Sequence, residues 1–469
     1  MRAAIAAERA GIPSVSIVCE GFAGQARATG RGYGYDQLAL AQTVGHVDAQ
    51  SSAEMIANFR GTTLDQIIDG LVGPDAETTG GEPAEPSALD VVLAGSIDEI
   101  NAAFLARGWS DGHPIIPPTI ERVEQFLEPL GHDPWKVLGV ASSSGRDVTV
   151  WSVAVNAVMA GCAPEVLPIL LAATNALLDP AYGVEHSGNT TGADALIVLS
   201  GPGSVERRFN HGAGALREGT HANTSVGRWL RLTLRNVFGF TSDGLDKATF
   251  GNSTRVVLAE DHAVLTKIGW PSLAEDLGAT PEADAISIAR LNSGTIIGSV
   301  FGSSPAEIAP YLGNGIARTA AWDLTHVYGL GHDQFAPLLV LSPILARTFA
   351  NAGMSKADVQ HLLFEHARIP AITFESMIGE WSNLTAGHRT LMDLVEEGAL
   401  PEVFAASDDP YRRVPVVTRP ERLLITVAGD PNRTNAYAFS NDGPHGWWTT
   451  KPIDAEMSTD LVCDVPQPE

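Results

Sequence analysis

The spacing of apolar residues near the start of the chain predicts a small unit of helices and strands. Residues 2–10 have the pattern of a short helix, and residues 14–19 alternate as a strand does. Residues 51–54 (SSAE) form a helix cap, and residues 62–71 continue as an amphipathic helix. A helix that feeds a strand is the second half of an α/β unit. We therefore expect a small α/β unit that is truncated, because it lacks the strand that should precede its first helix.

A polar segment follows this unit. Residues 73–88 read GPDAETTGGEPAEPSA and include no large apolar side chain. Such a segment cannot bury enough surface to offset the entropy lost on ordering. We therefore expect a small α/β unit over residues 1–72, an acidic Pro/Gly linker over 73–89, and a large domain over 90–469 that may be read as two subdomains.

The large domain alternates helical and extended patterns. A capping box at Ser96 and Glu99 begins an amphipathic helix, and two apolar helices are predicted over residues 148–160 and 165–178. Apolar runs typical of buried strands recur at residues 195–199, 255–258, 285–288, 337–341 and 423–427. This alternation predicts a glycine-rich α/β domain of layered sheet and helices. The sequence gives no sign of an internal repeat.

Charge and composition narrow the classes of function. The formal net charge of −25 opposes binding to nucleic acid. Proteins bind nucleic acid mainly through Lys and Arg side chains that neutralise its phosphates. No apolar run approaches the roughly 18–20 residues of a membrane-spanning helix, and the first residues do not resemble a secretory signal. Three scattered cysteines do not form a disulfide framework. We expect a soluble cytoplasmic homo-oligomer that acts on a small molecule, with no membrane or nucleic-acid partner.

A glycine-rich loop that leads into a helix is the strongest local pattern. Gly212 and Gly214 precede a helix predicted over residues 225–237, and free N–H groups at a helix start bind phosphate or carboxylate. One face of this helix carries arginines at spacings i, i+3 and i+7, namely Arg228, Arg231 and Arg235. Their planar guanidinium groups suit carboxylates. A solvated or ion-paired helix face is the alternative interpretation.

Two further residues are candidates for chemistry. Glu260 follows an apolar strand, and acidic groups at strand ends often serve as acid/base groups, although a surface loop is the alternative. Cys162 precedes a helix start, which favours a thiolate, and the alternative is a small buried apolar residue.

A histidine-containing segment has a spacing that a metal could use. It reads HVYGLGHD and contains His326, His332 and Asp333. No strict metal motif requires this spacing, so a structural or capping role is the alternative. The sequence indicates no particular cofactor.

Several unusual peptides occur in a recognisable order. They are AAIAAERAGIPSVSIVCEGFAGQARA at 3–28, DGHPIIPPT at 111–119, NAVMAGCAPE at 156–165, NTSVGRWLRLTLRN at 223–236, SKADV at 355–359 and LLITVAGD at 423–430. In these the chain resembles the UGSC-motif (seleno)protein family, which is similar in its N-terminal region to the selenoprotein B component of glycine, sarcosine and betaine reductases. The family's redox motif, U/C-G-S-C before the first helix, is absent from this sequence. Either the given start lies downstream of the true one, or this member has lost the redox pair.

The leading hypothesis is an enzyme that acts on a small anionic organic substrate. The resemblance implies reductive or eliminative cleavage of a carbon–heteroatom bond. The expected roles are substrate binding by Gly212, Gly214, Arg228 or Arg231, orientation by Asn156 and Asn223, acid/base catalysis by Glu260, and thiol chemistry by Cys162. One alternative is a redox-neutral lyase or hydrolase that uses Glu260, Asp111 and a histidine, with or without a metal. Another is a non-catalytic subunit of a reductase complex.

Overall fold

The structure is a computed structural model of the 469-residue chain. It describes residues 2–32, 35, 38–45, 50–72, 87–131, 133–242, 244–251, 256–321, 324, 327, 333–381, 390–442 and 446–453. Helices and strands alternate along the chain, so the predicted α/β class is confirmed. Within these residues, no helix has both the length and the apolar character that crossing a membrane requires.

The N-terminal unit has the predicted first helix and first strand, and it adds a helix between its two strands. Its elements are α1 (Arg2–Arg9), β1 (Ser16–Cys19), α2 (Ala23–Gly32), β2 (Leu40–Thr43), α3 (Ser52–Asn58), a π-helical segment (Phe59–Thr63) and α4 (Leu64–Val72). Strands β1 and β2 are parallel, with Ser16 opposite Leu40. The capping box at Ser51 is present, because its hydroxyl accepts from the Glu54 N–H and the Glu54 carboxylate accepts from the Ser51 N–H. Most of the linker expected over residues 73–89 lies outside the described residues.

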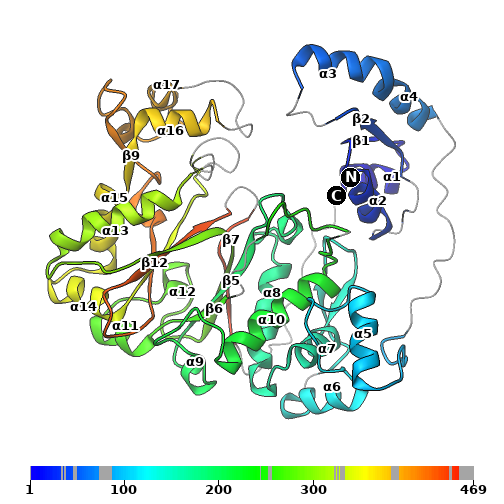
Figure 1. The fold of residues 1–469 in the computed structure, drawn as a ribbon, viewed down its shortest axis with the longest axis horizontal. Helices are drawn as coiled ribbons and strands as arrows, with labels where there is room; N and C mark the ends of the chain where they lie inside the picture. Colours follow the sequence, from blue (N-terminus) through cyan, green and yellow to red (C-terminus); the bar gives the residue numbers. More distant parts are fainter. Residues whose placement is uncertain are drawn as a thin grey trace, which may run out of the picture.

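Helices cover two flanks of the large domain (Figure 1). On one flank lie α5 (Ile97–Ala106), α6 (Ile120–Leu127), α7 (Val150–Ala160), α8 (Leu167–Leu178), the hairpin β3 (Val137–Val140) and β4 (Asp147–Thr149), α9 (Gly203–Glu206) and α10 (His221–Asn236). On the other lie α11 (His262–Ile268), α12 (Leu273–Asp276), α13 (Pro305–Thr319), α14 (Pro343–Asn351), α15 (Lys356–His366), α16 (Ala371–Ile378) and α17 (Leu391–Glu396). A small ladder joins β9 (Arg368–Pro370) to β10 (Arg413–Pro415).

A mixed sheet lies between the two flanks. Its strands are β5 (Asp194–Ser200), β6 (Val256–Ala259), β7 (Ala285–Ile297), β8 (Leu338–Leu341), β11 (Leu424–Val427), β12 (Ala436–Asn441) and β13 (Thr449–Pro452). The order is β11-β8-β12-β7-β5-β6, with β13 also paired to β7. The five strands predicted from apolar runs are all present. However, β7 extends nine residues beyond the predicted end at 288 and joins the two halves of the sheet.

The two halves of the sheet repeat one pairing pattern. In the first half, Leu196 of β5 lies opposite Val256 of parallel β6 and Ala289 of antiparallel β7. In the second half, Leu338 of β8 lies opposite Leu424 of parallel β11 and Phe439 of antiparallel β12. The central strands β7 and β12 are themselves antiparallel. The sheet therefore has an internal two-fold repeat, which corrects the expectation from the sequence.

Side chains on opposite faces of the strands enter different cores. In β5, Leu196 and Val198 join an interior cluster, while Ile197 and Leu199 pack under the α5–α10 flank. In β8, Leu338 and Val340 enter the same interior cluster, and the alternate residues Leu339 and Leu341 pack under the α11–α17 flank. The same cluster receives residues from both ends of the sheet, so the sheet curls around it.

The carboxyl ends of the two edge strands, β6 and β11, meet and complete the curl. The Asp261 N–H donates to the Val427 carbonyl at 2.8 Å. Glu260 is fully buried there, and its Oε1 accepts from the Leu273 N–H at 2.9 Å and from the Thr426 hydroxyl at 2.5 Å. Edge strands that meet in this way leave fewer unpaired backbone groups for another chain to pair with.

Gly294 gives a test of the interior packing. A Cβ at this position would lie 2.6 Å from Tyr437 Cε1 and 2.8 Å from Phe439 Cδ1, because both rings of β12 cross the glycine in β7. We expect Gly294→Ala to lower the free energy of unfolding by about 1–3 kcal/mol. Tryptophan fluorescence in a urea titration reports on this domain, because all nine tryptophans lie beyond residue 108.

The matched control for this substitution is Gly298→Ala, directly after the end of the same strand. Its nearest neighbour would be Asn435 Oδ1 at 4.0 Å, which leaves room for a methyl group. Equal unfolding midpoints for the two variants would contradict the close packing at Gly294.

Candidate functional site

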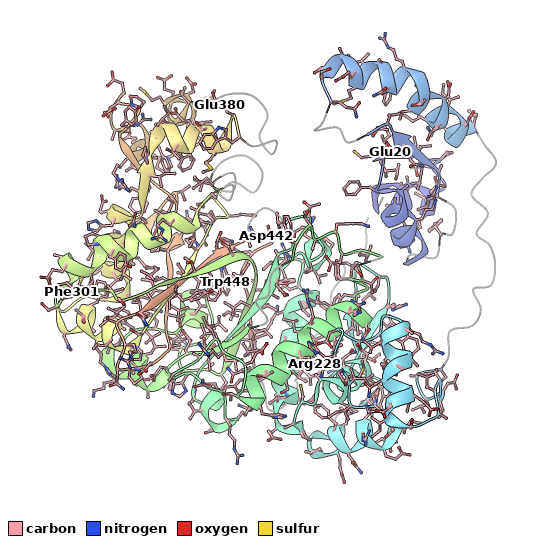
Figure 2. All side chains as sticks on the ribbon, in the orientation of Figure 1. Glu20, Arg228, Phe301, Glu380, Asp442 and Trp448 are labelled. Atoms are coloured by element: carbon pink, nitrogen blue, oxygen red, sulfur yellow. The ribbon has the colours of Figure 1, made fainter. Side chains whose placement is uncertain are left out.

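Helix α10 organises the candidate site. It begins at His221, four residues before the predicted start, and its apolar face is buried against the flank core. Trp229 is fully buried and its indole N–H donates to the Val153 carbonyl of α7 at 3.2 Å. This packing fixes the rotation of α10 and so directs its arginine-bearing face away from the core. Figure 2 labels Arg228 on this helix.

The glycine-rich loop before α10 is held by two asparagine side chains. Asn223, 5% exposed, accepts from the Asn210 N–H at 2.8 Å and donates to the Val257 carbonyl of β6 at 2.8 Å. Asn210 in turn accepts from the Gly212 N–H at 2.9 Å, and Gly214 has a φ of +73°, which favours glycine. The Asn223 amide therefore positions the loop, whereas the sequence suggested that it orients the substrate.

Arg228 is paired with Asp111 in a two-point contact. Its Nε and Nη2 lie 3.1 and 3.0 Å from the two carboxylate oxygens, and Nη2 also donates to the Pro114 carbonyl at 2.7 Å. The Asp111 side chain is 4% exposed. Removing either partner of such an ion pair is destabilising, because the other charge is then buried without compensation. The two residues, predicted separately, thus anchor the 111–119 loop to α10.

The other two arginines of the face also have partners. Arg231 Nη2 lies 3.3 Å from Asp194 Oδ2 at the start of β5, and the Asp194 side chain is 5% exposed. Arg235 donates from Nε to the Gly108 carbonyl. Ion pairing of Arg228 and Arg231 is what the alternative interpretation of this face predicts. Their charges are therefore largely neutralised by protein carboxylates.

A cavity of about 220 Å³ opens beside the glycine-rich loop, and we call it the loop cavity. Its walls include three apolar residues, Ala215, Leu216 and Val257. Its polar walls are formed by His113, Arg217, Glu218, Asn223, Thr224 and Arg228. Of the predicted substrate-binding residues, Asn223 and Arg228 line this cavity, whereas Gly212 and Gly214 do not and precede its wall at residues 215–218.

Like His113 and Glu218, Arg217 is a residue of the loop cavity that sequence reasoning missed. It is exposed, and within the described residues its guanidinium has no hydrogen bond or ion pair. Its backbone N–H bonds the Gly214 carbonyl, so the glycine turn sets its position. A single arginine between a glycine loop and a helix has no periodic signal. Only the structure shows that Arg217, unlike Arg228 and Arg231, has no ion pair among the described residues.

A second cavity of about 210 Å³ lies along the same face of α10, and we call it the Asp246 cavity. Asp111 lines it together with Arg231, Arg235 and Asp246. Since Asp111 is bound to Arg228, which lines the loop cavity, this ion pair is a wall common to both cavities.

Glu260 lies inside the sheet and not beside either cavity. Its side chain is 0% exposed, its Oε1 bridges β11 and α12, and its Oε2 is buried without a hydrogen bond to any described group. The sequence placed an acid/base group here because strand ends often border a crevice. In the structure this strand end meets the other edge of the sheet instead.

Asn156 and Cys162 are also buried. The Asn156 amide donates to the Ser152 carbonyl and accepts from Asn236, both at 2.9 Å, so it ties α7 to α10. Burial raises the pKa of the Cys162 thiol to about 12, against smaller lowering effects of a Ser225 hydrogen bond and the Arg228 charge. The environment thus favours the neutral thiol, whereas the nearby helix start suggested a thiolate.

The proposed metal-binding segment is described in part. His326 and His332 lie outside the described residues. Burial raises the pKa of Asp333, but hydrogen bonds from Arg422 and Thr418 outweigh this effect, so the pKa lies below its usual value. The Arg422 Nε donates to Asp333 Oδ1 at 3.1 Å, so this carboxylate already has a protein partner. Among the residues that the structure describes, no group of three or more His, Cys, Asp or Glu could hold a metal ion.

Comparison with known proteins gives a family match for the N-terminal unit. The model of the UGSC family matches residues 1–73, which correspond to the N-terminal unit. No curated protein and no solved structure matches the chain. The resemblance seen in residues 3–28 is therefore confirmed, and the resemblance of the large domain stays a prediction.

The Cys162 environment can be tested by alkylation with iodoacetamide. Only the thiolate reacts, so a thiol with a pKa of about 12 stays largely protonated at pH 8. We expect the modification of Cys162 in the folded protein to be slow at pH 8 and to increase up to pH 11. Peptide mass spectrometry identifies the modified site, with the partly exposed Cys19 as the internal reference. Fast modification of Cys162 at pH 7 would show an activated thiolate instead.

Proposed function

The N-terminal unit of this chain belongs to the UGSC family, and from this premise we propose an enzyme that binds a small anionic organic substrate in the loop cavity. The observation that carries the proposal is the Arg217 guanidinium, a cation without a protein partner among the described residues, beside the start of α10. A helix start and a guanidinium both attract anions. The cavity, at about 220 Å³, is below the usual 300–1,000 Å³ of drug-sized sites, so the substrate is small.

We propose eliminative cleavage of a carbon–heteroatom bond as the reaction. Glu218 removes a proton from the carbon next to the substrate carboxylate, and the C–H electrons form a carbon–carbon double bond. The bond to the heteroatom breaks, and His113 donates a proton to the leaving group. Both side chains line the loop cavity and carry the two proton-transfer groups that this chemistry needs.

The thiol environment favours elimination over reductive cleavage. A reductive step through a protein thiol needs a thiolate, and burial raises the pKa of Cys162 to about 12. Elimination needs no electron donor, because the electrons of the broken C–H bond remain in the product. The other described cysteine, Cys19, belongs to the N-terminal unit.

Anion binding is tested by replacing Arg217 with glutamine. Hydrogen bonds to a charged group contribute about 1.5–3 kcal/mol, so we expect Arg217→Gln to weaken binding of acetate, succinate or inorganic phosphate by about 10- to 100-fold. Isothermal titration calorimetry on the full chain measures the affinity. The matched control is Arg433→Gln, because that side chain is 74% exposed and does not line the cavity. Unchanged affinity in Arg217→Gln would remove the proposed anion site.

The acid/base role of Glu218 is tested by turnover. A panel of carboxylic acids with a leaving group on the second carbon from the carboxylate is screened for release of that group. We expect Glu218→Gln to lower kcat by about 100-fold or more, since general base catalysis contributes about 10²–10⁴-fold. Glu206→Gln in α9 is the control, because this glutamate is exposed and does not line the loop cavity. Equal loss in both variants, or no loss in Glu218→Gln, would assign the proton transfer elsewhere.

A further inference from the structure

The Asp246 cavity has features of a second binding site that the proposed reaction does not use. It measures about 210 Å³ and is lined by Asp111, Ser187, Arg231, Arg235, Phe240 and Asp246, with Leu234 beside them. The lining includes two arginines and two aspartates, so the formal charges of its walls cancel. A simple anion would gain from the arginines and lose at the aspartates, so the walls favour a ligand that has both a negative group and a hydrogen-bond donor.

The charged side chains of this cavity differ in the ion pairs and hydrogen bonds that they already make within the protein. Arg231 is paired with Asp194, and Asp111 is paired with Arg228. Asp246 accepts a hydrogen bond from the Ala248 N–H of its own turn at 3.1 Å, and Arg235 donates from Nε to the Gly108 carbonyl. The second carboxylate oxygen of Asp246 and the terminal nitrogens of Arg235 are thus the groups with capacity left for a ligand.

One of the residues that line the Asp246 cavity, Ser187, has a buried hydroxyl. The Ser187 hydroxyl lies beside that of Tyr182, and neither makes a hydrogen bond to any further described group, although both oxygen atoms are buried. Tyr182 is 1% exposed, and burial raises its pKa, so it keeps its proton at neutral pH. Buried hydroxyls are rarely left in this way. A polar ligand in the Asp246 cavity would supply Ser187 with a partner besides Tyr182.

We propose that the Asp246 cavity binds a small carboxylic acid with a hydroxyl or amino group on C2. Its carboxylate faces Arg235, its C2 substituent donates to Asp246 and meets Ser187, and its short carbon chain contacts Leu234 and Phe240. The cavity volume, below that of drug-sized sites, limits the ligand to a few carbon atoms. The ligand of this site would contact Arg235 and Asp246, whereas the ligand of the loop cavity would contact Arg217 and Glu218.

The test uses two ligands of equal shape, L-lactate and L-alanine, titrated calorimetrically into the full chain. We expect the wild-type protein to bind at least one of them. Asp246→Asn should weaken L-alanine at least 10-fold, because an ammonium group loses its ionic partner, and should weaken L-lactate by a smaller factor. Ser187→Ala should weaken each bound acid several-fold, and the only described side-chain group that it removes a contact from is the neighbouring Tyr182 hydroxyl.

Asp409→Asn is the matched control, because Asp409 accepts from the backbone N–H two residues on, as Asp246 does, but is exposed and remote from the cavity lining. Arg217→Gln should leave intact the part of the L-lactate and L-alanine binding that Asp246→Asn weakens, which separates this site from the proposed anion site. If wild type binds neither acid, or if Asp246→Asn binds both as wild type does, the assignment is overturned. Preference for one acid identifies whether an amino or a hydroxyl group is recognised.

Discussion

The meeting of β6 and β11 at their carboxyl ends is the contact on which the large domain depends. It is made by the Asp261–Val427 backbone bond and by Glu260, which joins Thr426 to the N–H of Leu273. Without it the sheet would be an open layer, and the interior apolar cluster would be exposed along one side. The same junction also holds the glycine-rich loop, because the neighbouring Gly429 N–H bonds the His211 carbonyl in that loop.

Local signals were sufficient to predict many of the helices and buried strands. Ser96 and Glu99 form the expected capping box, and the apolar run at 195–199 lies within β5. The sequence did not reveal the full length of β7, because Asn292, Ser293 and Gly294 interrupt its apolar pattern. These residues remain in the strand because β12 pairs with them, and that pairing joins segments far apart in the chain. The repeat was hidden for a related reason, since connections of different length separate its equivalent strands.

The candidate site was predictable as a helix face but not as a set of charges. Spacing alone places Arg228, Arg231 and Arg235 together, since an α-helix repeats every 3.6 residues. Their carboxylate partners could not be found in this way, because Asp111 precedes Arg228 by 117 residues. The structure shows that the three periodic arginines are each bound to other parts of the protein. We therefore propose Arg217, which lines the loop cavity, as the cation that binds a ligand. Glu260 and Cys162 were predicted as chemical groups from their places at a strand end and before a helix start. The structure buries both side chains away from the two cavities.

The repeated pairing pattern also describes how such a sheet can be assembled. Because β7 and β12 are antiparallel neighbours at the centre, a two-fold axis between them exchanges one half of the sheet for the other. In strand pairing alone, two copies of one half related by this axis would give the same order of six strands, to which β13 is an addition beside β7. Joining them in one chain frees each half to change independently. The α10 arginine face, with its two cavities, is then a specialisation of the first half that the second half does not need to share.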